Sequence, residues 1–246
     1  DLWLVANVCE EGLGDLKGMR AVVERFGDKP LAYLVLEGMS LGVVYNRALG
    51  VQRYRIKAKT EGGHSWADYG RPSAIHGLAK LVTELTAIKL PKDPRTSLNV
   101  GVITGGTSIN TIAAEASLEL DLRSVSPKSL SELAQKVEAL VEESNRPNLA
   151  FQAEIIGQRP AGEIPENHPL VRLAFEILEK QGLQPKLNIG STDANIPLSL
   201  GLPCICIGLT YGSGAHTLKE YIQTEPLEVG VSQLFELVSQ VFQALA

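Results

Sequence analysis

The hydrophobic and polar positions of this chain follow three patterns, and each predicts a different kind of element. Residues 1–11, 30–38 and 203–209 are nearly continuous apolar runs, as in strands buried on both faces of a parallel sheet. Residues 51–60 alternate polar and apolar positions with a period of two, which is typical of a strand with one wet face. Helical spacing of apolar positions predicts helices at 15–27, 72–89, 126–145, 168–182 and 226–245, with a further short helix after "STDAN". Further strands are predicted at 97–106, 111–124, 149–158 and 186–189.

The order of these elements predicts two domains. Between residues 52 and 159 the order is β-α-β-β-α-β, which is that of a ferredoxin-like unit. On both sides of this unit, buried strands alternate with helices, which favours a mostly parallel α/β sheet. We therefore predict an α/β domain of residues 1–51 and 160–246, with the α+β domain of residues 52–159 inserted into it.

Composition narrows the possible functions. The 246 residues carry a formal charge of −5, which argues against a nucleic-acid partner or a polybasic membrane surface. No apolar run approaches the roughly 20 residues that cross a bilayer, so no membrane partner is expected. There are three cysteines, and Cys204 and Cys206 lie within an apolar strand pattern rather than a disulfide framework. A cytoplasmic location is expected.

Acidic residues follow two of the apolar runs. Glu10 and Glu11 come at the end of the first run, and Glu37 comes at the end of the second. Open α/β sheets bind ligands at the carboxyl ends of their strands, and carboxylates gathered there are costly unless they are protonated or bound to a cation. The spacing therefore indicates a metal site, while a solvated loop after a strand remains the simpler alternative.

Four histidines are present, and they differ in context. His216 lies in a glycine-rich loop after strand 203–209, where it could ligate zinc beside the glutamates or merely cap a helix. His76, within an amphipathic helix, and His168, at a helix start, are interpreted as structural. His64 lies in the inserted domain, so it can reach the glutamates only through domain docking or a partner subunit.

Two further residues could have functional roles, but we interpret both as structural. Asp193, in "GSTDAN", is interpreted as an N-cap of the helix that follows. Cys9 precedes two acids that would suppress its thiolate, so we interpret it as a small buried hydrophobic residue.

Five segments occur in an order that resembles a known family. They are "NVCEEGLGD", "YLVLEGMS", "KTEGGHSWADYGRPSA", "GTSINTIAAEASLELDLRS" and "GSGAHTLKEY". Together they are similar to the two-zinc metallopeptidase family of glutamate carboxypeptidase, peptidase T, aminoacylase, succinyl-diaminopimelate desuccinylase and acetylornithine deacetylase. The resemblance covers essentially the whole chain, and the inserted domain corresponds to the lid or dimerisation domain of that family.

The resemblance implies a role for each matching residue in the α/β domain. Glu10 matches the general base that takes a proton from the metal-bound water. Glu11 and Glu37 match ligands of the two zinc ions, and His216 matches the histidine ligand near the C-terminus. Gly214 matches the loop that lines the substrate pocket.

Residues of the inserted domain match as well. His64 corresponds to the lid histidine that stabilises the oxyanion in the partner's active site. Asn110 and Arg123 correspond to a pair that binds the substrate, with Arg123 holding its carboxylate. From the residues alone, Arg123 could instead be a surface charge paired with Asp121, and Asn110 could be a hairpin-turn residue.

The implied activity is hydrolysis of an amide bond in a small peptide or N-acyl amino acid, with two zinc ions (cobalt or manganese are possible) and a homodimer formed through the inserted domain. One part of the family pattern is absent. The family carries an upstream His-x-Asp motif and a bridging aspartate, and neither His76 nor His168 has that context. We therefore expect the 246 residues alone to bind zinc poorly and to be inactive. The alternative is a non-catalytic homologue or fragment that serves as a dimerising small-molecule binding module.

Overall fold

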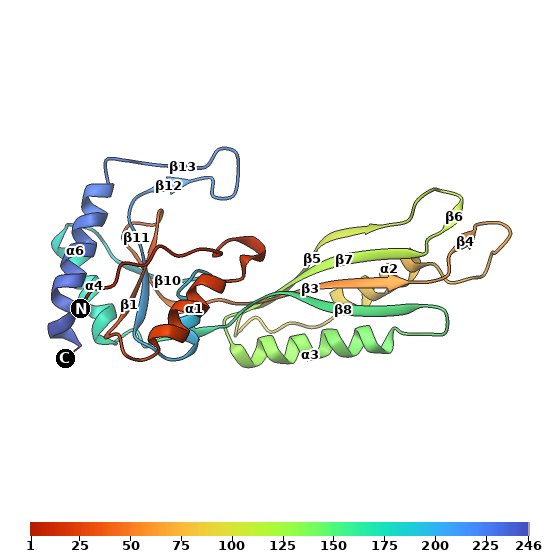
Figure 1. The fold of residues 1–246 in the computed structure, drawn as a ribbon, viewed down its shortest axis with the longest axis horizontal. Helices are drawn as coiled ribbons and strands as arrows, with labels where there is room; N and C mark the ends of the chain where they lie inside the picture. Colours follow the sequence, from red (N-terminus) through yellow and green to blue (C-terminus); the bar gives the residue numbers. More distant parts are fainter. Residues whose placement is uncertain (246) are drawn as a thin grey trace. The chain divides into compact units, whose positions relative to one another are not determined.

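The computed structural model describes residues 1–245, and the chain divides into two compact units (Figure 1). Unit 1 comprises Asp1–Leu49 and Arg159–Ala246, and unit 2 comprises Gly50–Gln158. The chain thus leaves the first unit, builds the second and returns. Each unit has its own cluster of buried apolar side chains.

Unit 1 is built on a mixed sheet. Its strands are β1 (Tyr33–Glu37), β2 (Val43–Ala48), β9 (Gly162–Glu163), β10 (Lys186–Gly190) and β11 (Cys204–Gly208). The order is β1-β11-β2-β10, with β9 beside β2. The ladders β1–β11 and β2–β10 are parallel, as expected, whereas β11–β2 and β2–β9 are antiparallel. All of Cys204–Ile207 is fully buried, which explains the uninterrupted apolar run there.

Helices pack on this sheet and short elements connect them. The helices are α1 (Lys17–Phe26), α4 (Pro169–Lys180), α5 (Asn195–Ser199) and α6 (Leu227–Ala244), with a 3₁₀ turn η1 at Gly12–Gly14. A small separate ladder joins β12 (Gly212–Ser213) to β13 (Tyr221–Ile222). His168 caps α4 by accepting a hydrogen bond from the Leu170 N–H on its ring nitrogen, in keeping with its structural interpretation. Among the residues described, none of the helices combines the length and apolar character that a bilayer crossing requires.

Unit 2 has the element order and strand order of a ferredoxin-like fold. Its elements are β3 (Gly50–Lys59), β4 (Gly63–His64), α2 (Ala74–Thr86), β5 (Thr96–Gly105), β6 (Thr111–Ile112), β7 (Glu115–Ser124), α3 (Pro127–Glu143) and β8 (Ala150–Arg159). The main sheet runs β5-β7-β3-β8, so the third long strand lies between the first and the second. This is the split βαβ arrangement that the sequence predicts.

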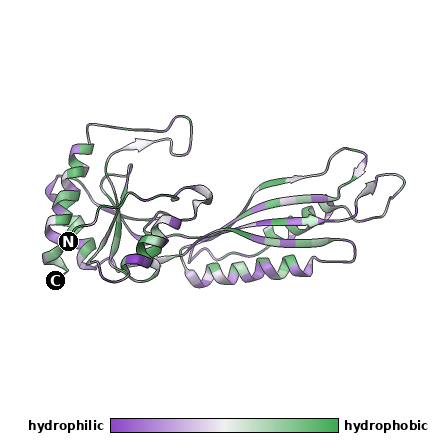
Figure 2. Cartoon of the chain, viewed as in Figure 1, coloured by the Kyte–Doolittle hydropathy of each residue, from purple (hydrophilic) through white to green (hydrophobic). Residues whose placement is uncertain are grey.

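The periodicities in unit 2 account for its core. Leu118, Leu120 and Leu122 alternate along β7 with partly exposed residues, and each of the three leucines is at most 1% exposed. Leu78 and Leu81 of α2 pack into the same cluster. Polar and apolar colours alternate along α3, as expected for a helix with one face on a sheet (Figure 2).

The strand expected at residues 1–11 is absent. Residues 1–10 have no regular secondary structure, and Leu4 is 89% exposed. Trp3 packs on the Phe26 ring instead, with their centroids 5.0 Å apart. The prediction is wrong because an apolar run specifies burial, whereas a strand also needs a hydrogen-bonding neighbour. Among the residues described, β1 pairs only with β11.

Candidate metal and substrate site

Carboxylates gather where β1 ends. Glu37 is the last residue of β1, and its carbonyl accepts a hydrogen bond of 2.9 Å from the Leu209 N–H beyond β11. Burial raises the pKa of Glu37 to about 6, and the charges of Glu10, Asp193 and Glu11 add to the shift. Glu37 therefore ends β1 within reach of the negative charges of three other acids.

Glu10 is held by a buried arginine. Arg159 Nη1 donates to Glu10 Oε1 at 3.0 Å, and Arg159 Nη2 donates to the Glu10 carbonyl. Burial raises the pKa of Glu10, while the Arg159 charge acts in the opposite direction. Sequence reasoning missed Arg159, because nothing in "GQRPAG" distinguishes it from an ordinary strand-end arginine.

Asp193 is a member of this group and is not an N-cap. The residue at the N-cap position of α5 is Ala194, which makes no side-chain capping bond. One carboxylate oxygen of Asp193 accepts from Asn7 Nδ2, and the other, Oδ1, is buried with no partner among the residues described. The N-cap prediction is wrong because Asn195 Oδ1 accepts the Thr192 N–H instead, which leaves Asp193 free to turn toward the acids.

Glycines allow the backbone around Glu10 to pack closely. A Cβ on Gly14 would lie 2.6 Å from the Cys9 carbonyl oxygen, and a Cβ on Gly18 would lie 1.9 Å from Asn7 Oδ1. The Leu16 N–H donates to the same Cys9 carbonyl at 2.9 Å. Cys9 itself is exposed, which corrects the prediction of a buried residue: the segment is not a strand, so its side chains do not alternate into a core.

His216 and Gly214 lie in the loop between β12 and β13. The His216 N–H donates to Glu220 Oε2 at 2.9 Å, and the histidine is exposed. Gly214 has a φ of +75°, and a Cβ there would come within 2.7 Å of the Lys219 carbonyl oxygen, so this turn requires glycine.

Glu11, Glu37 and His216 do not meet as a ligand set. Within residues 1–245, no three histidine, cysteine or acidic side chains lie close enough together to hold a metal ion. The chemistry of the acids nevertheless suits a divalent cation, because the buried Oδ1 of Asp193 lacks a donor and Glu37 carries an uncompensated charge. The described residues thus fit part of a metal centre.

In unit 2 the structure brings His64 and Asn110 together. His64 pairs with Thr111 in the β4–β6 ladder, and the Ser65 N–H donates to the Asn110 carbonyl at 3.0 Å. His64 Nδ1 accepts from the N–H groups of Trp66 (3.2 Å) and Ala67 (3.3 Å). Because Nδ1 accepts, the neutral ring carries its proton on Nε2, where it can donate to a ligand.

Arg123 lies far from this pair. It is next to the last residue of β7, whereas Asn110 precedes the start of that strand, so about 26 Å of extended chain separates the two positions. Arg123 Nε donates to Asp121 Oδ1 at 2.6 Å. Burial alone would raise the pKa of Asp121, but hydrogen bonds from Arg123 and Arg53 outweigh it and lower that pKa. The structure therefore contains the alternative Arg123–Asp121 ion pair and does not join Arg123 to Asn110.

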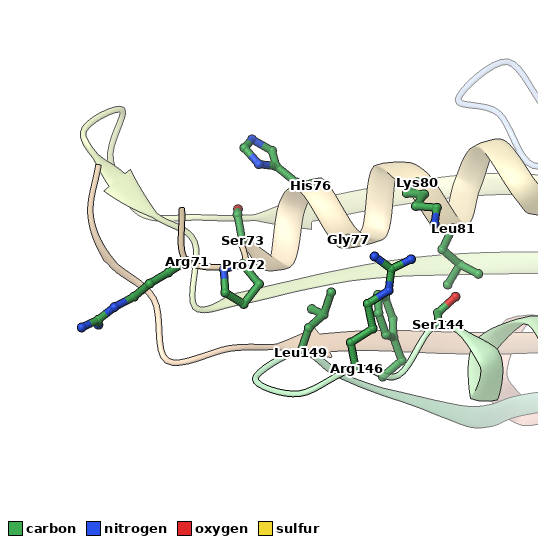
Figure 3. A pocket seen from close by; sticks show the side chains of 11 residues that line it. Arg71, Pro72, Ser73, His76, Gly77, Lys80, Leu81, Ser144, Arg146 and Leu149 are labelled. Atoms are coloured by element: carbon green, nitrogen blue, oxygen red, sulfur yellow. The ribbon is translucent and has the colours of Figure 1, made fainter. Parts of the chain in front are cut away.

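The cavities of unit 2 do not coincide with the predicted site residues. One, of about 220 Å³, lies between α2 and the turn before β8, where Figure 3 shows Lys80 and Arg146 beside Gly77. His76 lines it, but His64 and Asn110 do not. A larger one, of about 690 Å³, borders Gly63 and Thr111 and so adjoins the β4–β6 ladder.

The raised pKa of Glu37 predicts a pH-dependent stability in chelated buffer. The folded state binds a proton more readily than the unfolded state, so this group's contribution is fully present below pH 4.5 and is lost as the pH rises through about 6. We expect Glu37→Gln to remove about 1 kcal/mol of the stability that wild type gains between pH 7.5 and 5, after allowing for solvent screening. Urea unfolding at the two pH values measures it, with Glu163→Gln as the exposed control. Equal pH dependence in wild type and Glu37→Gln would contradict the burial of this carboxyl.

Comparison with known proteins finds a match for most of the inserted unit. Residues 47–148 match the family model described as a peptidase dimerisation domain. The chain is 34% identical over 89 residues to an N-acetyldiaminopimelate deacetylase of Bacillus licheniformis, covering 35% of this chain and 24% of that protein. It is 31% identical over 150 residues to an acetylornithine deacetylase of Klebsiella pneumoniae, covering 60% of this chain and 37% of that protein.

Solved structures show the same fold across both units. A tripeptidase of Staphylococcus aureus aligns with a TM-score of 0.78 at 22% identity, covering 93% of this chain and 61% of that one. The aminopeptidase PepT of Bacillus cereus aligns with a TM-score of 0.77 at 21% identity, covering 96% of this chain and 63% of that one. The chain therefore spans less than two thirds of the length of these relatives. The inserted unit thus matches a peptidase dimerisation domain, and the chain is similar to these deacetylases in sequence and to these peptidases in fold.

Proposed function

We propose that the full-length protein is a metal-dependent amide hydrolase that acts on small peptides or N-acyl amino acids. The observation that carries the proposal is the group of Glu10, Glu11, Glu37 and Asp193 at the end of β1, where burial and mutual repulsion raise the pKa of Glu37 to about 6. A cation would relieve that repulsion, and the carboxyl end of a strand in an α/β sheet is the usual place for a bound ligand.

In this proposal Glu11, Glu37 and His216 hold the metal, with zinc as the expected ion and cobalt or manganese as alternatives. When bound, such ions polarise the scissile carbonyl and lower the pKa of a bound water toward neutrality. Because these three side chains do not close a ligand set by themselves, the proposal requires further ligands that follow the family pattern. Gly214 keeps the loop that carries His216 in its tight turn.

Glu10 acts as the general base. Its Oε1 accepts from Arg159, and its Oε2 accepts no hydrogen bond from the residues described. Oε2 can therefore take a proton from the attacking water and deliver it to the nitrogen of the leaving amine. Glu10 begins and ends the cycle as a carboxylate, so the proton passes from water to product without net change in the enzyme.

The distance between the two sets of proposed substrate-binding residues in unit 2 supports a homodimer. His64 Nε2–H and Asn110 lie at one end and are proposed to donate to the carbonyl oxygen, whereas Arg123, at the other end, binds the free carboxylate of the substrate. In a dipeptide these groups lie within about 10 Å, well short of the roughly 26 Å between the two ends. One bound substrate would therefore receive His64 and Asn110 from one protomer and Arg123 from its partner, through the dimerisation domain.

Cysteine usage bears on the location. Cys9, Cys204 and Cys206 are all free thiols. This is the state that a reducing cytoplasm maintains, and a cytoplasmic location is part of the proposal.

Assays of the full-length protein test the proposal. We expect turnover of dipeptides, tripeptides or N-acyl amino acids with zinc, cobalt or manganese, loss of that turnover in chelator, and its return when metal is added back. Binding of these compounds without turnover under any metal would instead support the non-catalytic binding module. Comparing peptides with N-acyl amino acids as substrates separates peptidase from deacylase activity.

A further inference from the structure

Arg159 is unusual in its burial. It ends β8, and the whole residue is 6% exposed. Arginine is almost never this buried unless it is paired, because removing a guanidinium from water is costly. Its ion pair with Glu10 is the only salt bridge of Arg159 among the residues described, and Glu10 keeps 26% of its side chain exposed.

The guanidinium binds both the side chain and the main chain of Glu10. Nη1 donates to Glu10 Oε1 at 3.0 Å, and Nη2 donates to the Glu10 carbonyl. Nη1 also lies 3.2 Å from the Ser191 carbonyl and 3.4 Å from its hydroxyl. The planar, rigid guanidinium of Arg159 thus holds the backbone and one carboxylate oxygen of Glu10 against the turn that precedes Asp193.

The two carboxylate oxygens of Glu10 therefore differ in their hydrogen bonding. Oε1 is occupied by Arg159, whereas Oε2 accepts no hydrogen bond from the residues described. An ion pair that served stability alone would need no contact with the Glu10 carbonyl. The double contact fixes the direction in which the free oxygen points.

We infer that Arg159 is the positioning residue for Glu10: it holds Oε1 and the main chain of the general base so that Oε2 faces the attacking water. The inference rests on the proposed function. Arg159 donates hydrogen bonds throughout and transfers no proton. Lysine cannot replace it fully, because one ammonium group cannot reach the carboxylate, the Glu10 carbonyl and Ser191 in the same planar geometry.

The test uses the full-length protein with Arg159→Gln and Arg159→Lys. We expect Arg159→Gln to lower kcat by about 10²-fold, with KM within about threefold of wild type. Metal content and melting temperature are measured on the same samples, and metal content should stay unchanged. Arg159→Lys, which keeps the charge and should fold even if Arg159→Gln does not, should lose about tenfold in kcat.

The matched control is Arg47→Gln, which removes an arginine of the same unit from an exposed ion pair with Glu163. It should leave kcat unchanged. Added guanidinium should restore part of the kcat of Arg159→Ala, a rescue that a purely structural loss of stability would not show. Wild-type kcat in Arg159→Lys or Arg159→Gln, beside an inactive Glu10→Gln, would overturn the inference while the proposed function stands. Full activity in Glu10→Gln would overturn the proposed function itself.

Discussion

We expect replacement of Glu10 by glutamine to lower kcat of the full-length protein by about 10³-fold and to leave the proposed metal in place. The amide keeps the shape of the side chain and can still accept from Arg159 through its oxygen. It cannot take a proton from the attacking water, so the loss falls on the chemical step rather than on substrate binding. Steady-state kinetics with metal analysis on the same sample measures both effects.

The control for this result is Glu163→Gln, which makes the same chemical change at an exposed ion pair of unit 1. It should retain wild-type kcat and metal content. A Glu10→Gln variant with nearly wild-type kcat would show that another group accepts the proton. A variant that lost its metal together with its activity would assign Glu10 to the ligands instead of to the base.

Mixing two inactive variants should restore activity if His64 serves the partner's site. We expect Glu10→Gln and His64→Ala each to be nearly inactive alone. In a mixed dimer, one site combines an intact Glu10 from the His64→Ala chain with an intact His64 from the Glu10→Gln chain. Random assortment makes half the dimers mixed, with one complete site each, so about a quarter of wild-type activity should return.

The mixing experiment carries its own control. The double variant, with both changes in one chain, mixed with either single variant contains no complete site and should stay inactive. Recovery is followed after co-refolding or subunit exchange, by kcat per total protein. If the mixture of single variants gains nothing while mixed dimers are demonstrably present, His64 acts within its own protomer or not at all.

The sequence predicted unit 2 well because its signals are local. The period-two pattern of β7 and the helical spacing in α2 and α3 each specify both the element and its buried face. The strand predicted at residues 1–11 is absent because a strand also needs a paired neighbour. The apolar pattern within the run does not reveal whether such a neighbour exists.

Parts of the candidate site could not be read from the sequence because they depend on long-range contacts. Arg159 meets Glu10 across 149 positions, and Asp193 meets Asn7 across 186. Asp193 looked like a cap because Ser-Thr-Asp before a helix usually is one, and only packing reveals that Asn195 serves the turn instead. Asn110 and Arg123 stand close in the sequence, yet an extended strand separates them.

The central claim is that the acids at the end of β1 belong to one metal centre, with Glu37 as a ligand and Glu10 as the base. The most direct measurement is metal content per protomer of the full-length wild type, Glu10→Gln and Glu37→Gln after dialysis against zinc. We expect about two zinc ions in wild type and in Glu10→Gln, and fewer in Glu37→Gln. Equal zinc in all three, or none in wild type, would contradict it.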